Sequence, residues 1–190
     1  MIDFPVPLLG FCAWSGAGKT TLLRRLLPLL RAHGLRVAVV KHAHHSFDVD
    51  HPGKDSYELR EAGADQVLVA SRNRVAWIRE LQRRHEAPPL EEVLRCLDNG
   101  AIDLVLVEGY KSAALPKIEV HRPALGRPLL HPGDPHVIAV ASDRPVATPL
   151  PWLDLNRPVQ VARFILRHLH RSEENRHADH DHSYRSQLCR

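Results

Sequence analysis

The chain has 190 residues and a formal net charge of +4, from 26 basic and 22 acidic side chains. That length suits one α/β domain with its own hydrophobic core and is short for two. The charges are spread along the chain without a dense basic stripe, so we expect no nucleic-acid partner. No run approaches the roughly 20 apolar residues that span a bilayer, so we expect no membrane partner either.

Cysteine use indicates a reducing compartment. The three cysteines, Cys12, Cys96 and Cys189, are far apart and odd in number, unlike the cysteines of a disulfide framework. The first residues, MIDFPVPLLGF, lack the basic start of a signal peptide. We therefore expect a cytoplasmic protein.

Apolar segments of β character alternate with helical patterns in the first half of the chain. Pro28 should kink the first helix. The polar block KHAHHSFDVDHPGKDS after the second strand is too hydrophilic for a core and is predicted to be a functional loop. The expected elements are a strand over 7–12, a helix over 19–33, a strand over 36–40, a short helix over 55–63, and a hairpin of strands over 66–70 and 74–78.

The same alternation continues in the second half and is typical of βαβ units around a mostly parallel sheet. The run from Ile102 to Val107 is apolar throughout, as a central strand buried on both faces requires. The expected elements are a helix over 90–100, strands over 102–107, 117–121 and 136–142, a proline-rich loop over 122–135, and a last helix over 158–168.

Residues 171–190 differ from the rest in composition. They contain almost no apolar side chains and carry four arginines against four acids, so they cannot offset the entropy cost of ordering. We predict a P-loop nucleotide-binding domain over 1–170 and a His-rich, disordered tail over 171–190.

The segment AWSGAGKT, Ala13 to Thr20, carries the P-loop prediction. It matches G-x-x-x-x-G-K-[ST] except for alanine at the first position, and it stands between an expected strand and an expected helix. Alanine suits a position that needs close approach but not a positive φ. In such a loop the main-chain N–H groups surround the phosphates, the lysine reaches the β and γ phosphates, and the hydroxyl binds Mg²⁺. The predicted nucleotide-binding residues are Ser15, Gly16, Ala17, Gly18, Lys19, Thr20 and Thr21.

The motif and the alternation together predict an α/β, P-loop NTPase-like three-layer fold, with a mostly parallel central sheet flanked by helices. Glu108, which ends the apolar strand, resembles the acidic residue of a Walker B element and is a candidate for the Mg²⁺ side of the site. Alternatively, Glu108 caps the strand end or pairs with Lys111. Asp48 and Asp50 follow the second strand, where related enzymes place a Mg²⁺-coordinating carboxylate.

A polar cluster also follows the second strand, at the edge where open α/β sheets bind ligands. Lys41, His42, His44 and His45 are candidates for contact with phosphate or substrate. The histidine spacing also suits Zn²⁺, although no cysteine or second ligand set accompanies it. A solvated loop is the remaining alternative.

Four segments together resemble the MobB family of molybdopterin-guanine dinucleotide biosynthesis proteins: AWSGAGKTTL, VVKHAHHSFDVDHPGKDSYELREAGA, LVLVEGYK and VIAVASD. The likeness runs from about Leu8 to His170, and the second segment is the most specific. The family's P-loop looks like this one, the alanine included.

This resemblance implies a homodimer that binds GTP with Mg²⁺, has weak GTPase activity, and assists a guanylyltransferase in attaching GMP to the molybdopterin-type cofactor. By position, it implies that Asp50 and Glu108 lie near Mg²⁺ and act with Lys19 in any hydrolysis. Asp143, after the strand VIAVAS, is a candidate for reading the guanine base, because a carboxylate accepts from guanine N1 and N2. The tail extends beyond the resemblance.

Two other functions are compatible with the same motifs. A small-molecule or nucleotide kinase uses the same P-loop, with residues 122–136 as a candidate lid, although these residues also suit a proline-stiffened connection. A GTP-dependent metal chaperone would use the histidine cluster and the tail histidines. The sequence contains no recognisable arginine finger or water-orienting glutamine, which is why we expect hydrolysis to be weak.

Overall fold

The computed structural model describes residues 2–43, 47–81 and 87–171. They form two compact units, which divide the range predicted as one P-loop domain. The first unit takes in Met1–His42 and the chain from Pro89 onward, and the second takes in Ala43–Pro88. Except for Arg171, the predicted tail lies outside the described residues.

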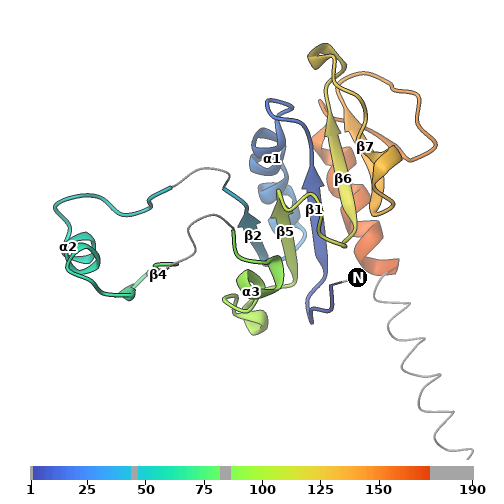
Figure 1. The fold of residues 1–190 in the computed structure, drawn as a ribbon. Helices are drawn as coiled ribbons and strands as arrows, with labels where there is room; N and C mark the ends of the chain where they lie inside the picture. The colour runs from blue at the N-terminus through green and yellow to red at the C-terminus, as the bar shows by residue number, and fades with distance from the viewer. Residues whose placement is uncertain (1, 44–46, 82–86, 172–190) are drawn as a thin grey trace, which may run out of the picture. The chain divides into compact units, whose positions relative to one another are not determined.

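A six-stranded sheet forms the centre of the first unit (Figure 1). Its order is β2-β5-β1-β6-β7-β8, and every neighbouring pair is parallel. This confirms the mostly parallel sheet, while the three-residue β8 lacks the length that a sequence pattern needs for recognition. The strands are β1 (Leu8–Cys12), β2 (Val37–Lys41), β5 (Leu104–Glu108), β6 (Lys117–His121), β7 (Val137–Ser142) and β8 (Trp152–Asp154).

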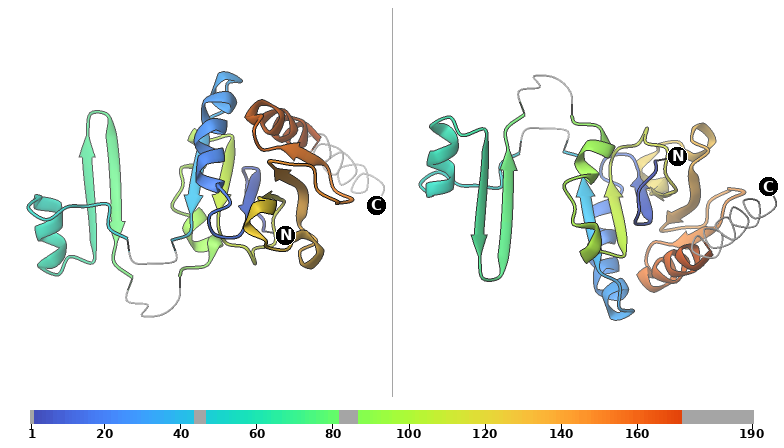
Figure 2. Two further views of the ribbon diagram at one scale, coloured as in Figure 1. Left: turned by 90° about the horizontal axis from the view of Figure 1, so that it is seen from above. Right: turned by 90° about the horizontal axis from the view of Figure 1, so that it is seen from below.

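Helices cover both faces of this sheet, as the three-layer prediction requires. Helix α1 (Lys19–Ala32) and the helix over 158–171 lie on one face, and α3 (Leu90–Leu94) lies on the other (Figure 2). The larger core contains Leu22, Leu26 and Leu30 of α1 packed with Leu9 and Phe11 of β1. The smaller core joins α3 to β2 and β5. Burial of these apolar stripes stabilises the layered arrangement.

The helix expected over 90–100 is shorter than predicted. It ends at Leu94, and a separate 3₁₀ turn covers Asn99–Ala101. The carboxylate of Asp98 accepts a hydrogen bond from Gly100 N at 3.1 Å. This bond caps the 3₁₀ turn and competes with helix formation there. Directly after α3, Cys96 N and Leu97 N bond to carbonyls three residues back, which tightens the chain beyond Leu94.

The second unit contains α2 (Asp55–Glu61) and an antiparallel hairpin of β3 (Gln66–Ser71) and β4 (Arg74–Arg79). The hairpin confirms the sequence prediction. The guanidinium of Arg60 on α2 donates to Asp48 and to Glu80, both at 2.7 Å. These contacts connect the loop before α2, the helix itself and the end of β4.

All five residues of β6 are buried, although three of them are polar. The carboxylate of Glu119 accepts the N–H groups of Leu130 and His131 at 2.7 and 2.9 Å. The ammonium of Lys117 donates to Asp134 at 2.6 Å and to the carbonyl of Lys111 at 2.7 Å. The polar face of β6 therefore holds the proline-rich loop against the sheet.

Replacing Glu119 with alanine should destabilise the protein by roughly 3 kcal/mol, because two enclosed N–H groups lose their charged acceptor. Urea unfolding followed by circular dichroism measures this change. Glu91→Ala removes an exposed carboxylate from the same unit and serves as the control. Equal stability of the two variants would show that Glu119 does not hold the loop.

Candidate nucleotide-binding site

The glycine-rich loop joins β1 to α1 at the carboxyl edge of the sheet. Gly16 and Gly18 have φ values of 79° and 96°, which favour glycine, whereas buried Ala13 keeps a negative φ. The expectation that the first motif position needs closeness without positive φ therefore agrees with the backbone.

The amino end of α1 is open toward this loop. Its N-cap residue Gly18 makes no side-chain cap, and the first turn contains no acidic residue. The bond from Leu22 N to Gly18 O closes the first turn, so the earlier N–H groups have no acceptor within the helix. Together with the helix dipole, this arrangement favours an anion at the loop.

Thr20, near the start of α1, contacts Glu108, the last residue of β5. The Thr20 hydroxyl donates to the Glu108 carboxylate at 2.7 Å, and Glu108 is only 8% exposed. A hydroxyl and a carboxylate side by side at the start of the helix supply oxygen ligands of the kind that Mg²⁺ prefers. The two residues therefore fit the predicted metal side of the site.

Lys19 is half-buried among charged groups of both signs. Burial lowers its pKa from the ordinary value, Glu108 opposes that shift, and nearby Lys111 and Lys41 reinforce it. An anion in the loop would relieve the repulsion among these ammonium groups. The electrostatics thus favour a phosphate ligand beside Lys19.

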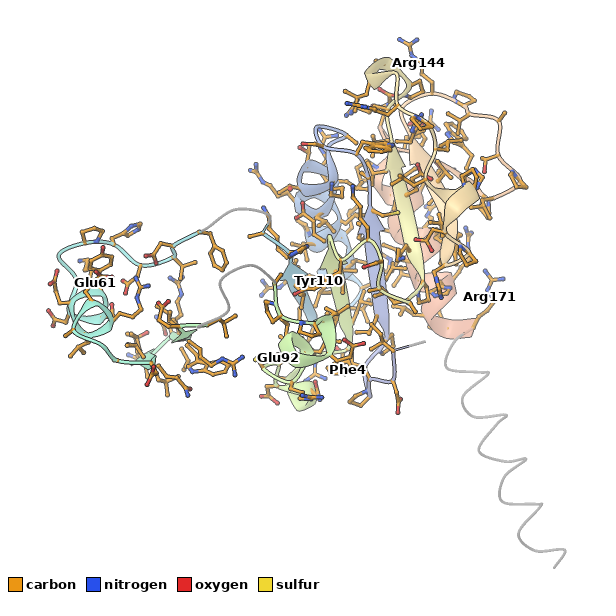
Figure 3. The ribbon with its side chains drawn as sticks, viewed as in Figure 1. Phe4, Glu61, Glu92, Tyr110, Arg144 and Arg171 are labelled. Atoms are coloured by element: carbon orange, nitrogen blue, oxygen red, sulfur yellow. The ribbon has the colours of Figure 1, made fainter. Side chains whose placement is uncertain are left out.

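The chain turns sharply after Glu108. Gly109 and Tyr110 both have positive φ, at 95° and 47°. The ring of Tyr110, labelled in Figure 3, stacks on His42 with centroids 4.6 Å apart, and His42 N donates to the Glu108 carbonyl at 2.8 Å. Of the predicted contact residues, Lys41 and His42 therefore lie beside Glu108, at the ends of β2 and β5.

Two further residues of this edge escaped the sequence analysis. The indole of Trp14 donates to the carbonyl of Pro128 at 2.8 Å, with the cations of Lys111 and Arg127 over its ring at 5.3 and 5.5 Å. Arg122 donates to the Ala17 carbonyl and to the Asp143 carboxylate. The bonded partners are 114, 105 and 21 positions apart in the chain, so no local pattern reveals these contacts.

The predicted base-reading residue Asp143 follows β7 at the same edge. The next residue in the chain is Arg144. It lies at the opposite end of the first unit from Arg171, the last described residue (Figure 3). Beyond the Arg122 contact, Asn156 donates to the Asp143 carbonyl at 3.3 Å. The structure thus places Asp143 in reach of the phosphate loop through one intervening side chain.

The remaining candidates lie elsewhere. Asp48 and Asp50 belong to the second unit, where the Asp50 carboxylate accepts from Ser56 at 3.0 Å. The proximity of Asp50 to Mg²⁺ stays a prediction. His44 and His45 lie outside the described residues. Within the described ranges, no group of three or more His, Cys, Asp or Glu side chains is placed to hold a metal ion.

Gly109→Ala should destabilise the protein by roughly 2 kcal/mol or more, because alanine resists the positive φ and its Cβ would lie 2.7 Å from the Cβ of His42. Thermal unfolding compares the variant with Gly133→Ala, where an added Cβ meets no atom within 4 Å. Matching midpoints for the two variants would contradict a strained turn after Glu108.

The parallel sheet, the glycine-rich loop after β1 and the open end of α1 define a P-loop NTPase-like fold. The chain belongs to the MobB family, described as molybdopterin guanine dinucleotide synthesis protein B, whose model matches residues 8–143. Both the predicted fold class and the predicted family are thereby confirmed.

Individual relatives agree with this assignment. The chain is 48% identical over 162 residues to the molybdopterin-guanine dinucleotide biosynthesis adapter protein of Escherichia coli K12, which covers 85% of this chain and 92% of the relative. The adapter protein of the same description from Haemophilus influenzae is 43% identical over 165 residues, or 87% and 90% of the two chains. The crystal structure of a molybdopterin-guanine biosynthesis protein B superposes with a TM-score of 0.64 at 30% identity, over 84% of this chain and 97% of that one.

Within the described residues, no helix has both the length and the apolar character that crossing a bilayer requires.

Proposed function

We propose that this protein is an adapter in molybdopterin-guanine dinucleotide biosynthesis that binds GTP and Mg²⁺ at its P-loop. Membership of the MobB family supports the pathway. The observation that carries the nucleotide site is the open amino end of α1, faced by Gly16, Gly18 and Lys19. Backbone donors, helix dipole and ammonium group all favour a phosphate chain.

Mg²⁺ belongs beside this phosphate chain. Thr20 and Glu108 would hold it directly or through water, and Asp50 is the third candidate by family resemblance. When bound, the ion neutralises charge on the β and γ phosphates. The protein's own contribution is to hold Lys19 against the phosphates and to fix the Thr20 hydroxyl next to a buried carboxylate.

Hydrolysis at this site is weak in our proposal. Glu108 is engaged by Thr20 in the structure, and the sequence offers no recognisable water-orienting glutamine or arginine finger. Lack of such groups costs on the order of 10³ to 10⁵ in rate. The nucleotide therefore serves mainly as a bound ligand, and turnover is secondary.

The proposed partner enzyme and substrate follow from the adapter role. We propose that the protein works beside the molybdenum cofactor guanylyltransferase and its molybdopterin-type substrate, with Asp143 reading guanine and with Lys41 and His42 contacting the substrate. We also place it in the cytoplasm. Burial raises the pKa of the Cys12 thiol to about 12, so this cysteine is suited to packing and not to disulfide exchange.

The kinase alternative is less well supported. Its candidate lid, residues 122–136, is bonded to Glu119 of β6 and to Trp14 of the P-loop. A segment bonded at both places is a poor lid, because opening it would leave enclosed polar groups without partners. Transfer of labelled γ-phosphate to a small acceptor would favour the kinase over the adapter.

Lys19→Ala should weaken GTP binding by roughly 10-fold to 100-fold, because the phosphate chain loses a charge-assisted hydrogen bond. Calorimetric titration with GTP and with ATP, with and without the guanylyltransferase, measures this loss and the base preference. Arg25→Ala, on the exposed face of α1, removes the same charge away from the loop and is the control. Unchanged GTP affinity in Lys19→Ala would refute the nucleotide site.

The hairpin of the second unit supports a homodimer. Leu68 pairs with Trp77, and Ala70 pairs with Val75, so these side chains share one face of the hairpin. Leu68 and Val75 are 66% exposed and Trp77 is 43% exposed. A hairpin with an uncovered apolar face is marginal on its own. A second copy of the chain is the occupant that we propose for this face.

Leu68→Glu and Trp77→Glu should each convert the dimer to a monomer, because the charge would be buried without a partner. Light scattering coupled to size-exclusion chromatography gives the mass. Val159→Glu changes an apolar residue of the first unit with 48% exposure and should leave the mass unchanged. A monomeric parent protein, or hairpin variants that remain dimeric, would disprove this interface.

A further inference from the structure

Arg122 occupies a position between the two halves of the proposed nucleotide site. It follows β6 directly, and β6 pairs with β1 on one side and with β7 on the other. The P-loop follows β1 and Asp143 follows β7. A side chain at this point of the carboxyl edge can therefore reach both the phosphate loop and the base-reading loop.

The guanidinium of Arg122 forms hydrogen bonds to both loops. Its Nε donates to the carbonyl of Ala17 at 3.0 Å, and its Nη1 donates to Asp143 Oδ2 at 2.8 Å. A Cβ placed on Gly18 would lie 3.6 Å from both Nε and Nη2. The guanidinium therefore contacts the loop immediately before Lys19.

One nitrogen of the fork remains for a ligand. No described residue accepts a hydrogen bond from Nη2 of Arg122, and the side chain is 37% exposed. Arginine is the side chain best suited to phosphate oxygens, since its rigid fork donates from several nitrogens at once. The free donor lies at the rim of the loop that we assign to phosphate.

The carboxylate of Asp143 also has one oxygen available to a ligand. Arg122 occupies Asp143 Oδ2, whereas Asp143 Oδ1 is enclosed and has no hydrogen-bond partner among the described residues. An enclosed acceptor without a donor is unfavourable until a ligand supplies one. Arg122 therefore offers a hydrogen-bond donor at the phosphate loop, and Asp143 offers an acceptor at the proposed base site.

We propose that Arg122 is a nucleotide-binding residue: its Nη2 donates to the phosphate chain while the rest of its guanidinium fixes the P-loop and Asp143. This inference rests on the proposed nucleotide binding and adds a second fixed cation to Lys19. A purely structural role would need only the contacts to Ala17 and Asp143. A phosphate role requires the positive charge.

Three substitutions separate these roles. Arg122→Ala removes every contact, Arg122→Lys keeps the charge without the fork, and Arg122→Gln keeps an amide donor without the charge. Calorimetry with GTP and with tripolyphosphate, which has no base, measures each variant. Arg25→Ala is the charge-matched control, and thermal unfolding without ligand reports folding.

Arg122→Ala should weaken both GTP and tripolyphosphate by about 10-fold to 100-fold, Arg122→Lys should recover part of this loss, and Arg122→Gln should not. The control should bind as the parent protein does. Tripolyphosphate binding that survives Arg122→Ala, or recovery by glutamine equal to that by lysine, would overturn the phosphate contact. A parent protein that binds neither GTP nor tripolyphosphate would instead overturn the proposed function from which this inference starts.

Discussion

The common direction of the six sheet strands is the constraint on which the candidate site depends. Parallel strands end at one edge, and here that edge receives the P-loop after β1, Glu108 at the end of β5, and Asp143 after β7. The hydrogen bond from Thr20 to Glu108 is possible because β1 and β5 are neighbours in register. The P-loop, Glu108 and Asp143 therefore gather at one edge although they are far apart in the sequence.

The buried polar face of β6 gives this edge its rigidity. Glu119 and Lys117 hold the proline-rich loop, and that loop in turn accepts the indole N–H of Trp14 from the P-loop. Arg122, at the start of the same loop, contacts Ala17. The segment that follows β6 therefore supports the phosphate loop, which favours a preformed binding site.

Local signals sufficed for most of the fold. The hairpin of β3 and β4, the apolar strand β5 and helix α1 were predicted because periodicity and turn residues are short-range properties. The differences between the predicted and the observed elements also have local causes. Asp98 caps a 3₁₀ turn that stands in place of the end of the predicted helix, and β8 has only three residues. Polar Glu119 is buried because the loop that directly follows β6 folds back over it.

The sequence by itself determined the family, the P-loop motif and the mostly parallel sheet, since these follow from contiguous residues and strand chemistry. Only the tertiary structure decided that Thr20 touches Glu108, that Trp14 bonds to Pro128, and that Arg122 joins Ala17 to Asp143. The reason is that side-chain contacts between strand ends depend on strand order and register, which no local pattern encodes.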